Sequence, residues 1–194
     1  MTTHSAAADR AVAFLRRLGA DGIAHPGGTL LAHLQRVQAR LATWEARTAL
    51  QLAGLCHALY GTDGFPAALL TLDRRADLAA VIGTEAEAVV YLYASCDRAV
   101  TYPAFSDAVF RDRFTGRTYR PPGQLRRDFA ELSAANEIDL AHADPAFREK
   151  WGPELMSLFA RLRDLLSDAA WLDCRTVLGT PSQPALRERT RRTR

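Results

Sequence analysis

Two stretches of sequence decide the fold: TLLAHLQRV at residues 29–37 and AGLCHALYGTD at residues 53–63. Apolar residues recur at helical spacing in both stretches, with His33 among them in the first and His57 in the second. We therefore expect two consecutive amphipathic helices, with both imidazoles pointing into the core between them.

Helical patterning continues along the rest of the chain. Helices are expected at residues 5–18, 29–44, 48–60, 67–82, 88–97, 124–142 and 154–171. The stretch 99–123 between them looks irregular, and a Thr-Gly pair within FTGRTY predicts a short hairpin around residues 113–120. The sequence predicts an all-α, single-domain bundle over residues 1–178, followed by a basic disordered tail at 179–194.

The composition is that of an ordinary globular protein, with 194 residues, 48% of them hydrophobic and 24% charged. No apolar run is long enough to cross a bilayer, and the N-terminus lacks the pattern of a secretory signal. Three widely separated cysteines, Cys56, Cys96 and Cys174, indicate reduced thiols. We therefore expect a cytoplasmic protein without membrane contact.

The net charge of +3 comes from the tail, because residues 181–194 carry five Arg and one Glu. The folded part is close to neutral, so a nucleic-acid partner is not expected.

Two inward imidazoles on adjacent helices can share one metal ion, since metal sites in helical bundles use side chains from facing helices. The structural alternative is that His33 and His57 are hydrogen-bonded core residues. Spacing alone leaves both interpretations open.

The HLQRV segment beginning at His33 and the LCHALYG segment around His57 resemble the HD-domain superfamily. This resemblance implies an all-α bundle and a divalent metal site, with His33 as the first metal histidine and His57 as the histidine of the His-Asp doublet. It also implies a final aspartate on a later helix, for which Asp97 and Asp139 are the acidic candidates. Asn136 is a neutral alternative on nearly the same face as Asp139.

The chain departs from the HD pattern at Ala58, which stands where the family has the doublet aspartate. Alanine cannot ligate a metal or help to activate water. Three functions therefore compete. The first is metal-assisted hydrolysis of an anionic metabolite. The second is a mononuclear Fe(II) oxygenase with two histidines and one carboxylate. The third is a ligand-binding protein, metal-free or non-catalytic, with a degenerate site. Fe(II), Mn(II) and Zn(II) are the candidate metals.

Two further residues are candidates for a catalytic role. His25 lies in the loop before the first histidine helix, where it would act as a third ligand or contact the substrate. Tyr60 lies three residues after His57, so we expect it to share the same helix face, where it would donate a hydrogen bond to a bound oxyanion or ligate iron weakly.

The segment 111–127 carries six Arg and one Asp. Because guanidinium groups suit carboxylates and phosphates, we expect it to draw an anionic small molecule to the helical pocket. Arg113, Arg117, Arg120 and Tyr119 are the candidate substrate-binding residues. The alternative is a solvated loop whose arginines pair with Asp107, Asp112 and Asp128.

Overall fold

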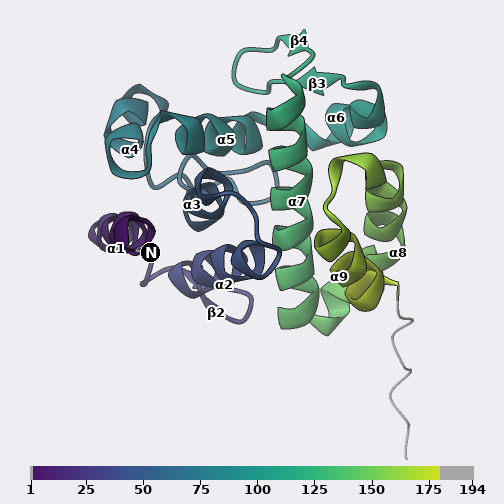
Figure 1. The fold of residues 1–194 in the computed structure, drawn as a ribbon, viewed down its shortest axis with the longest axis horizontal. Helices are drawn as coiled ribbons and strands as arrows, with labels where there is room; N and C mark the ends of the chain where they lie inside the picture. Colours follow the sequence, from purple (N-terminus) through teal and green to yellow (C-terminus); the bar gives the residue numbers. More distant parts are fainter. Residues whose placement is uncertain (1, 180–194) are drawn as a thin grey trace, which may run out of the picture.

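The computed structural model describes residues 2–179 of the protein (Figure 1). Nine α-helices account for most of this part of the chain: α1 Thr2–Arg17, α2 Leu30–Thr43, α3 Thr48–Cys56, α4 Arg75–Ile82, α5 Thr84–Ser95, α6 Arg98–Ala104, α7 Gly123–Ala143, α8 Pro145–Arg161 and α9 Asp168–Leu178. Single 3₁₀ turns precede α4, follow α6 and precede α9.

The all-α prediction is confirmed, since the described residues form only two sheets, each of two short strands. Strands β3 (Phe110–Arg111) and β4 (Thr118–Tyr119) pair antiparallel, which places a hairpin where the Thr-Gly pair predicted one. Strands β1 (Ala24–His25) and β2 (Gly28–Thr29) form a second, unpredicted hairpin just before α2.

The long helix α7 organises the molecule (Figure 1). Helices α2 and α5 pack against one side of it, with α3 between them, and α8 and α9 pack against the other. Phe129, Leu132 and Ile138 of α7 are almost completely buried. The middle of α7 is therefore core, so its polar side chains must find partners within the protein.

The histidine helices pack as the sequence predicts. Thr29 caps α2 by accepting a hydrogen bond from the amide of Ala32 at 3.2 Å. A Cβ on Gly54 of α3 would lie only 2.5 Å from Leu41 Cδ1 of α2, so glycine permits the close approach of the two helices. His33 and His57 are 1% and 2% exposed, which confirms that both imidazoles face the core.

Several element boundaries differ from the sequence prediction. Helix α3 ends at Cys56 instead of Tyr60, and the helix expected from residue 67 starts at Arg75. The unpredicted α6 occupies part of the stretch expected to be irregular, and α8 begins at Pro145, with Pro153 inside the helix.

None of the helices in residues 2–179 combines the length and apolar character that crossing a bilayer requires. The three cysteines are free and buried. Apart from Gly179, the predicted basic tail lies outside the described residues.

Candidate functional site

The β1–β2 hairpin, the C-terminal end of α3, and helices α2 and α7 enclose a cavity of about 290 Å³. Its polar lining groups are His25, His33, His57, Thr62, Arg98, Asn136 and Glu137. Phe65 and Phe147 supply apolar wall, and Ala58 also lines the cavity. All three histidines singled out in the sequence therefore meet in one place.

His33 is held by a buried carboxylate. Its Nδ1 lies 2.7 Å from Asp139 Oδ2, and Arg36 binds both oxygens of Asp139 at 2.8 and 2.9 Å. Burial alone would raise the pKa of Asp139, but the hydrogen bonds from His33 and Arg36 outweigh it and lower the pKa to about 2. Asp139 is therefore a carboxylate that accepts the Nδ1–H of His33 and leaves the His33 Nε2 facing the cavity.

His57 is fixed by its own helix. Its Nδ1 lies 2.8 Å from the carbonyl oxygen of Gly54, which accepts the Nδ1–H and leaves Nε2 as the lone-pair nitrogen. Burial, reinforced by the nearby His33, lowers the pKa of His57 to about 3. The His33 and His57 ring centroids are 5.3 Å apart, with the rings nearly perpendicular.

Asn136 stands beside the two imidazoles. Its Oδ1 is 3.1 Å from His33 Nε2, and its Nδ2 donates to Glu137 Oε1 at 3.2 Å. Turning the amide over would place its oxygen against the Glu137 carboxylate, so this network fixes its orientation. Two lone-pair atoms, His33 Nε2 and Asn136 Oδ1, are then in contact unless a proton or a metal ion supplies positive charge between them.

His25 completes the histidine cluster. It stacks on His33 with ring centroids 4.1 Å apart. Burial, followed by the repulsion of His33, lowers the pKa of His25 to about 4. The imidazoles of His25 and His57 are therefore neutral near pH 7, which is the form that ligates metals and accepts hydrogen bonds.

The two carboxylates predicted as metal ligands have other partners. Asp139 lies behind His33, with both oxygens bound by Arg36. Asp97 is the N-cap of α6 and accepts a hydrogen bond from the amide of Val100 at 3.2 Å. Among residues 2–179, no three His, Cys, Asp or Glu side chains form a metal-ligating group. The neutral donor groups that lie together in the cavity are the three imidazoles and the Asn136 amide.

The structure corrects the position predicted for Tyr60. Because α3 ends at Cys56, the residues after His57 follow a turn instead of continuing the helical face. The Tyr60 hydroxyl donates to Glu87 at 3.0 Å, and Arg75 also binds this carboxylate. Tyr60 does not line the cavity.

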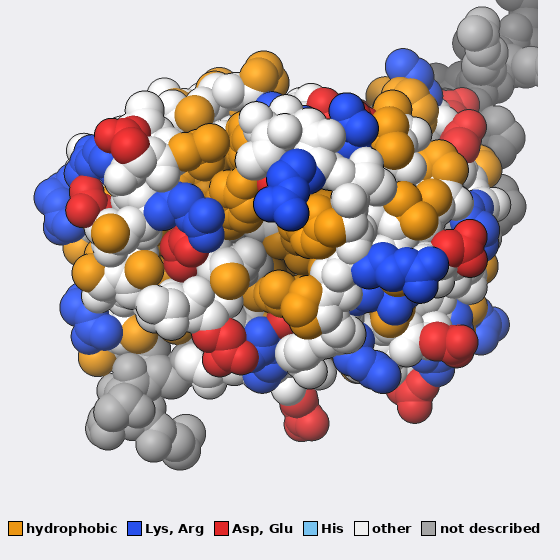
Figure 2. Space-filling view, turned by 90° about the horizontal axis from the view of Figure 1, so that it is seen from above, with side chains coloured by type: hydrophobic (Ala, Val, Ile, Leu, Met, Phe, Trp, Pro, Cys, Tyr) orange, Lys and Arg blue, Asp and Glu red, His pale blue; other side chains and the backbone are white. Residues whose placement is uncertain are grey.

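The predicted substrate-binding residues Arg113, Arg117, Arg120 and Tyr119 also lie outside the cavity lining. They belong to the β3–β4 region before α7, whereas Asn136 lies 13 residues into that helix, or about 20 Å along its axis. The face in Figure 2, which includes this end of the molecule, shows scattered basic side chains around an apolar hollow instead of one continuous basic surface.

The predicted alternative of acidic pairing is not seen for Asp112 and Asp128. Asp112 accepts hydrogen bonds from Tyr91 and from backbone amides, while Asp128 pairs with Arg47 of the α3 N-terminus. Arg113 donates to the carbonyl of Ala94 at 2.7 Å.

Sequence reasoning missed Arg98 and Glu137. The Arg98 guanidinium bonds to Glu137 Oε1 at 3.0 Å, and both side chains line the cavity. Arg98 is the first residue of the short helix α6, in a stretch without a periodic apolar pattern, so the sequence does not predict which way its side chain points. Glu137 offered a usable signal, since a carboxylate inside the apolar stretch of a buried helix needs a cationic partner.

Fold and site together define a helical bundle with a histidine-lined cavity. Residues 14–98 match the model of a family described as a domain of unknown function, DUF6817. This segment contains the three histidines and Arg98 but ends before α7, which supplies Asn136 and Asp139. No curated protein and no solved structure matches the chain.

Proposed function

We propose that the protein is a small-molecule enzyme of HD-like architecture that binds one divalent metal ion through His33 and His57, with Asn136 as the oxygen donor. The observation that carries this proposal is the pairing of both Nδ1 atoms, His33 with Asp139 and His57 with Gly54 O. Metal-binding histidines characteristically donate their second ring N–H to a carboxylate or backbone carbonyl in this way.

The contact of His33 Nε2 with Asn136 Oδ1 at 3.1 Å gives independent support. Two lone pairs that converge on one point are a ligand arrangement, and a cation there would remove their repulsion. A bound divalent ion would polarise a substrate oxygen and lower the pKa of water as a Lewis acid.

The charges of the cavity favour an anionic substrate. The three proposed ligands are neutral, so the positive charge of the metal is left for the substrate to balance. Arg98 lines the same cavity and presents its guanidinium next to Glu137. A volume of about 290 Å³ suits a small metabolite.

Hydrolysis fits this ligand set better than oxygenation. The iron site of two histidines and one carboxylate needs a carboxylate at the metal. Asp139 is bound by Arg36, and Glu137 is bound by Arg98. We therefore propose metal-assisted hydrolysis of an anionic metabolite, in which Arg98 holds the anionic group and His25 contacts the substrate.

One observation favours a second candidate, metal-free acid–base catalysis or ligand binding. The His33–Asp139 pair at 2.7 Å would equally stabilise a proton on His33 Nε2, which would then donate to Asn136 Oδ1. In that case His33 would act as a general acid.

Activity of the metal-loaded full-length chain tests the proposal. The protein is loaded separately with Mn(II), Zn(II) and Fe(II) and offered a panel of small phosphate and carboxylate esters, while hydrolysis products and oxygen uptake are both measured. We expect hydrolysis that is lost in His57→Gln and retained in Tyr60→Phe, which removes a buried hydroxyl outside the cavity. Oxygen uptake that requires His57 would select the oxygenase instead, and hydrolysis without metal would select the acid–base candidate.

A further inference from the structure

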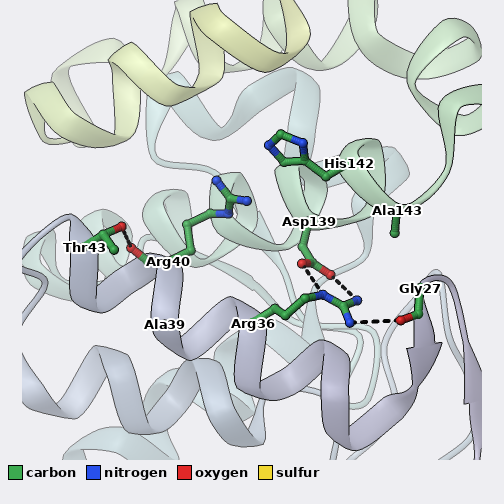
Figure 3. Close-up of a pocket in the computed structure, with 8 residues that line it drawn as sticks. All are labelled: Gly27, Arg36, Ala39, Arg40, Thr43, Asp139, His142 and Ala143. Atoms are coloured by element: carbon green, nitrogen blue, oxygen red, sulfur yellow. Dashed lines mark hydrogen bonds and ion pairs between the residues drawn. The ribbon is translucent and has the colours of Figure 1, made fainter.

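A second, larger cleft is lined by Asp139 but not by His33 (Figure 3). Its volume is about 520 Å³, and α2 and the C-terminal end of α7 form its walls. Its lining residues are Gly27, Arg36, Ala39, Arg40, Thr43, Asp139, His142 and Ala143. Asp139 therefore belongs to the walls of this cleft while it also holds His33 of the histidine cavity.

Two arginines one helical turn apart face this cleft. Like charges at this spacing oppose helix formation unless anions compensate them. Arg36 has several hydrogen-bond partners, because it binds Asp139 and donates to the carbonyls of Pro26 and Gly27.

The guanidinium of Arg40 has hydrogen-bond partners for only some of its N–H groups. Its Nη1 pairs with Asp173 of α9, but its buried Nε has no hydrogen-bond partner among the described residues. A buried donor without a hydrogen-bond partner is unfavourable, so the Arg40 guanidinium is not fully satisfied by Asp173.

His142 adds another donor at the same place. Figure 3 shows its ring over the cleft on the side of Arg40, and it makes no hydrogen bond to any residue in the described part of the chain. Ala39 and Ala143 contribute only methyl groups to the walls. The cleft thus combines available N–H donors, two cationic side chains and open space.

We propose that this cleft binds a small oxyanion, the phosphate or carboxylate group of a metabolite, with Arg40 and His142 as its principal donors. An oxyanion in the cleft would accept hydrogen bonds from the Arg40 guanidinium and from His142, and it would separate the charges of the two arginines. It would lie next to the Arg36–Asp139 pair that positions His33, so its binding is expected to be felt at the histidine cavity. The proposal stands independently of whether that cavity binds metal.

Inorganic phosphate and succinate, titrated separately into metal-free full-length protein, test the proposal and distinguish a phosphoryl from a carboxylate ligand. Binding is followed by calorimetry and by the imidazole NMR signals of His142. We expect saturable binding of one anion per chain and a shift of the His142 signals. Arg40→Gln should weaken binding about tenfold, as expected for loss of a charge-assisted hydrogen bond.

Two further variants make the result decisive. His142→Ala removes an exposed ring outside the core, so it tests the cleft even if Arg40→Gln destabilises the fold, and it should also weaken binding. Arg74→Gln, which alters an exposed pair with Asp77, should not change binding. Absence of saturable binding of either anion, or equal binding by Arg40→Gln, His142→Ala and the unmodified protein, would overturn the proposal.

Discussion

At the scale of single residues, Asp139 connects the histidine cavity with the second cleft. It lies on α7, accepts a hydrogen bond from His33 and is clamped by Arg36 of α2. Its charge is thus matched on both sides, and it orients the His33 imidazole without being available as a ligand itself.

Replacing Asp139 by Asn keeps the shape but removes this charge. We expect Asp139→Asn to lose about 1–3 kcal/mol of unfolding free energy, because the buried position loses a charge-assisted pair while Arg36 remains partly exposed to solvent. Metal affinity should fall about 10- to 100-fold, as is usual when the partner of a ligating histidine is removed. Urea denaturation and metal titration measure the two effects.

Asp173→Asn is the matched control, since it breaks another arginine–aspartate pair, that of Arg40. It should reduce stability without changing metal affinity. Equal metal affinity in Asp139→Asn and the unmodified protein would contradict the role assigned to Asp139.

Ala58 offers a gain-of-function test, because it lines the cavity and follows His57, where the resemblance to the HD pattern would imply an aspartate. We expect Ala58→Asp to destabilise the metal-free protein by about 2–4 kcal/mol, since it buries a charge. Added Mn(II) should reverse this loss and bind more tightly than to the unmodified protein. Thermal unfolding with and without metal checks both effects. Ala58→Asn, neutral and of the same shape, is the control, and an equal response of both variants to metal would argue against a metal in this cavity.

Because the imidazoles of His25 and His57 are shielded from solvent, we expect the free energy of unfolding of the chelator-treated protein to depend on pH. His25 and His57 have pKa values lowered to about 4 and about 3, so they stay neutral in the folded state at pH values where the unfolded chain binds protons. Stability contributed by this difference is present above pH 6.5 and is lost as the pH falls towards 4. For His57 the loss is about 2 kcal/mol at pH 5. Urea unfolding at several pH values should show it, and His57→Gln should show a shallower decline; an unchanged decline would contradict the assignment.

At the scale of elements, the β1–β2 hairpin carries His25 onto the cavity and is tied down by Arg36, which binds the carbonyls of Pro26 and Gly27. Gly27 has φ +77°, and a Cβ there would lie 3.0 Å from both Ala143 Cβ and Arg36 Nη2. This glycine therefore serves both the turn and the contact between hairpin and bundle.

We expect Gly27→Ala to lower the free energy of unfolding by more than backbone strain alone would. We predict a loss of about 2–3 kcal/mol in unfolding free energy, combining left-handed strain with displacement of Arg36. Gly19→Ala is the control, because Gly19 has φ +81° but open space around its Cβ position, and its cost should be only about 1 kcal/mol. Denaturant titration compares the two variants, and equal losses would show that the packing of the hairpin against Arg36 contributes nothing.

The elements also show what the sequence could predict. The periodicity around His33 and His57 correctly predicted two packed helices with inward imidazoles, because burial of an apolar face leaves a strong pattern. The end of α3 at Cys56 was missed, since the apolar residues up to Tyr60 continue the pattern through a turn. The helix predicted to start after Pro153 begins earlier, because Asp144 is the N-cap of α8 and Pro145 is its first residue.

At the scale of the whole molecule, the candidate site joins parts of the chain that are far apart. His33 and Asp139 are separated by 106 positions, and the pair forms only because α2 packs on α7. The sequence pattern could therefore single out the histidines, Asn136 and Asp139 as candidates. It could not predict that Asn136 lies next to Nε2 of His33 while Asp139 binds Nδ1. Tertiary packing also determines that Arg98 lines the cavity and that the arginines of residues 111–127 do not.

Elemental analysis of full-length protein purified without chelator tests most directly whether the histidine cavity binds one divalent metal ion. We expect about one equivalent of a transition metal per chain, as a single site requires, and its loss in both His33→Gln and His57→Gln with the fold retained by circular dichroism. A metal-free protein that also fails to bind added Fe(II), Mn(II) or Zn(II), or metal retained in both variants, would contradict the claim.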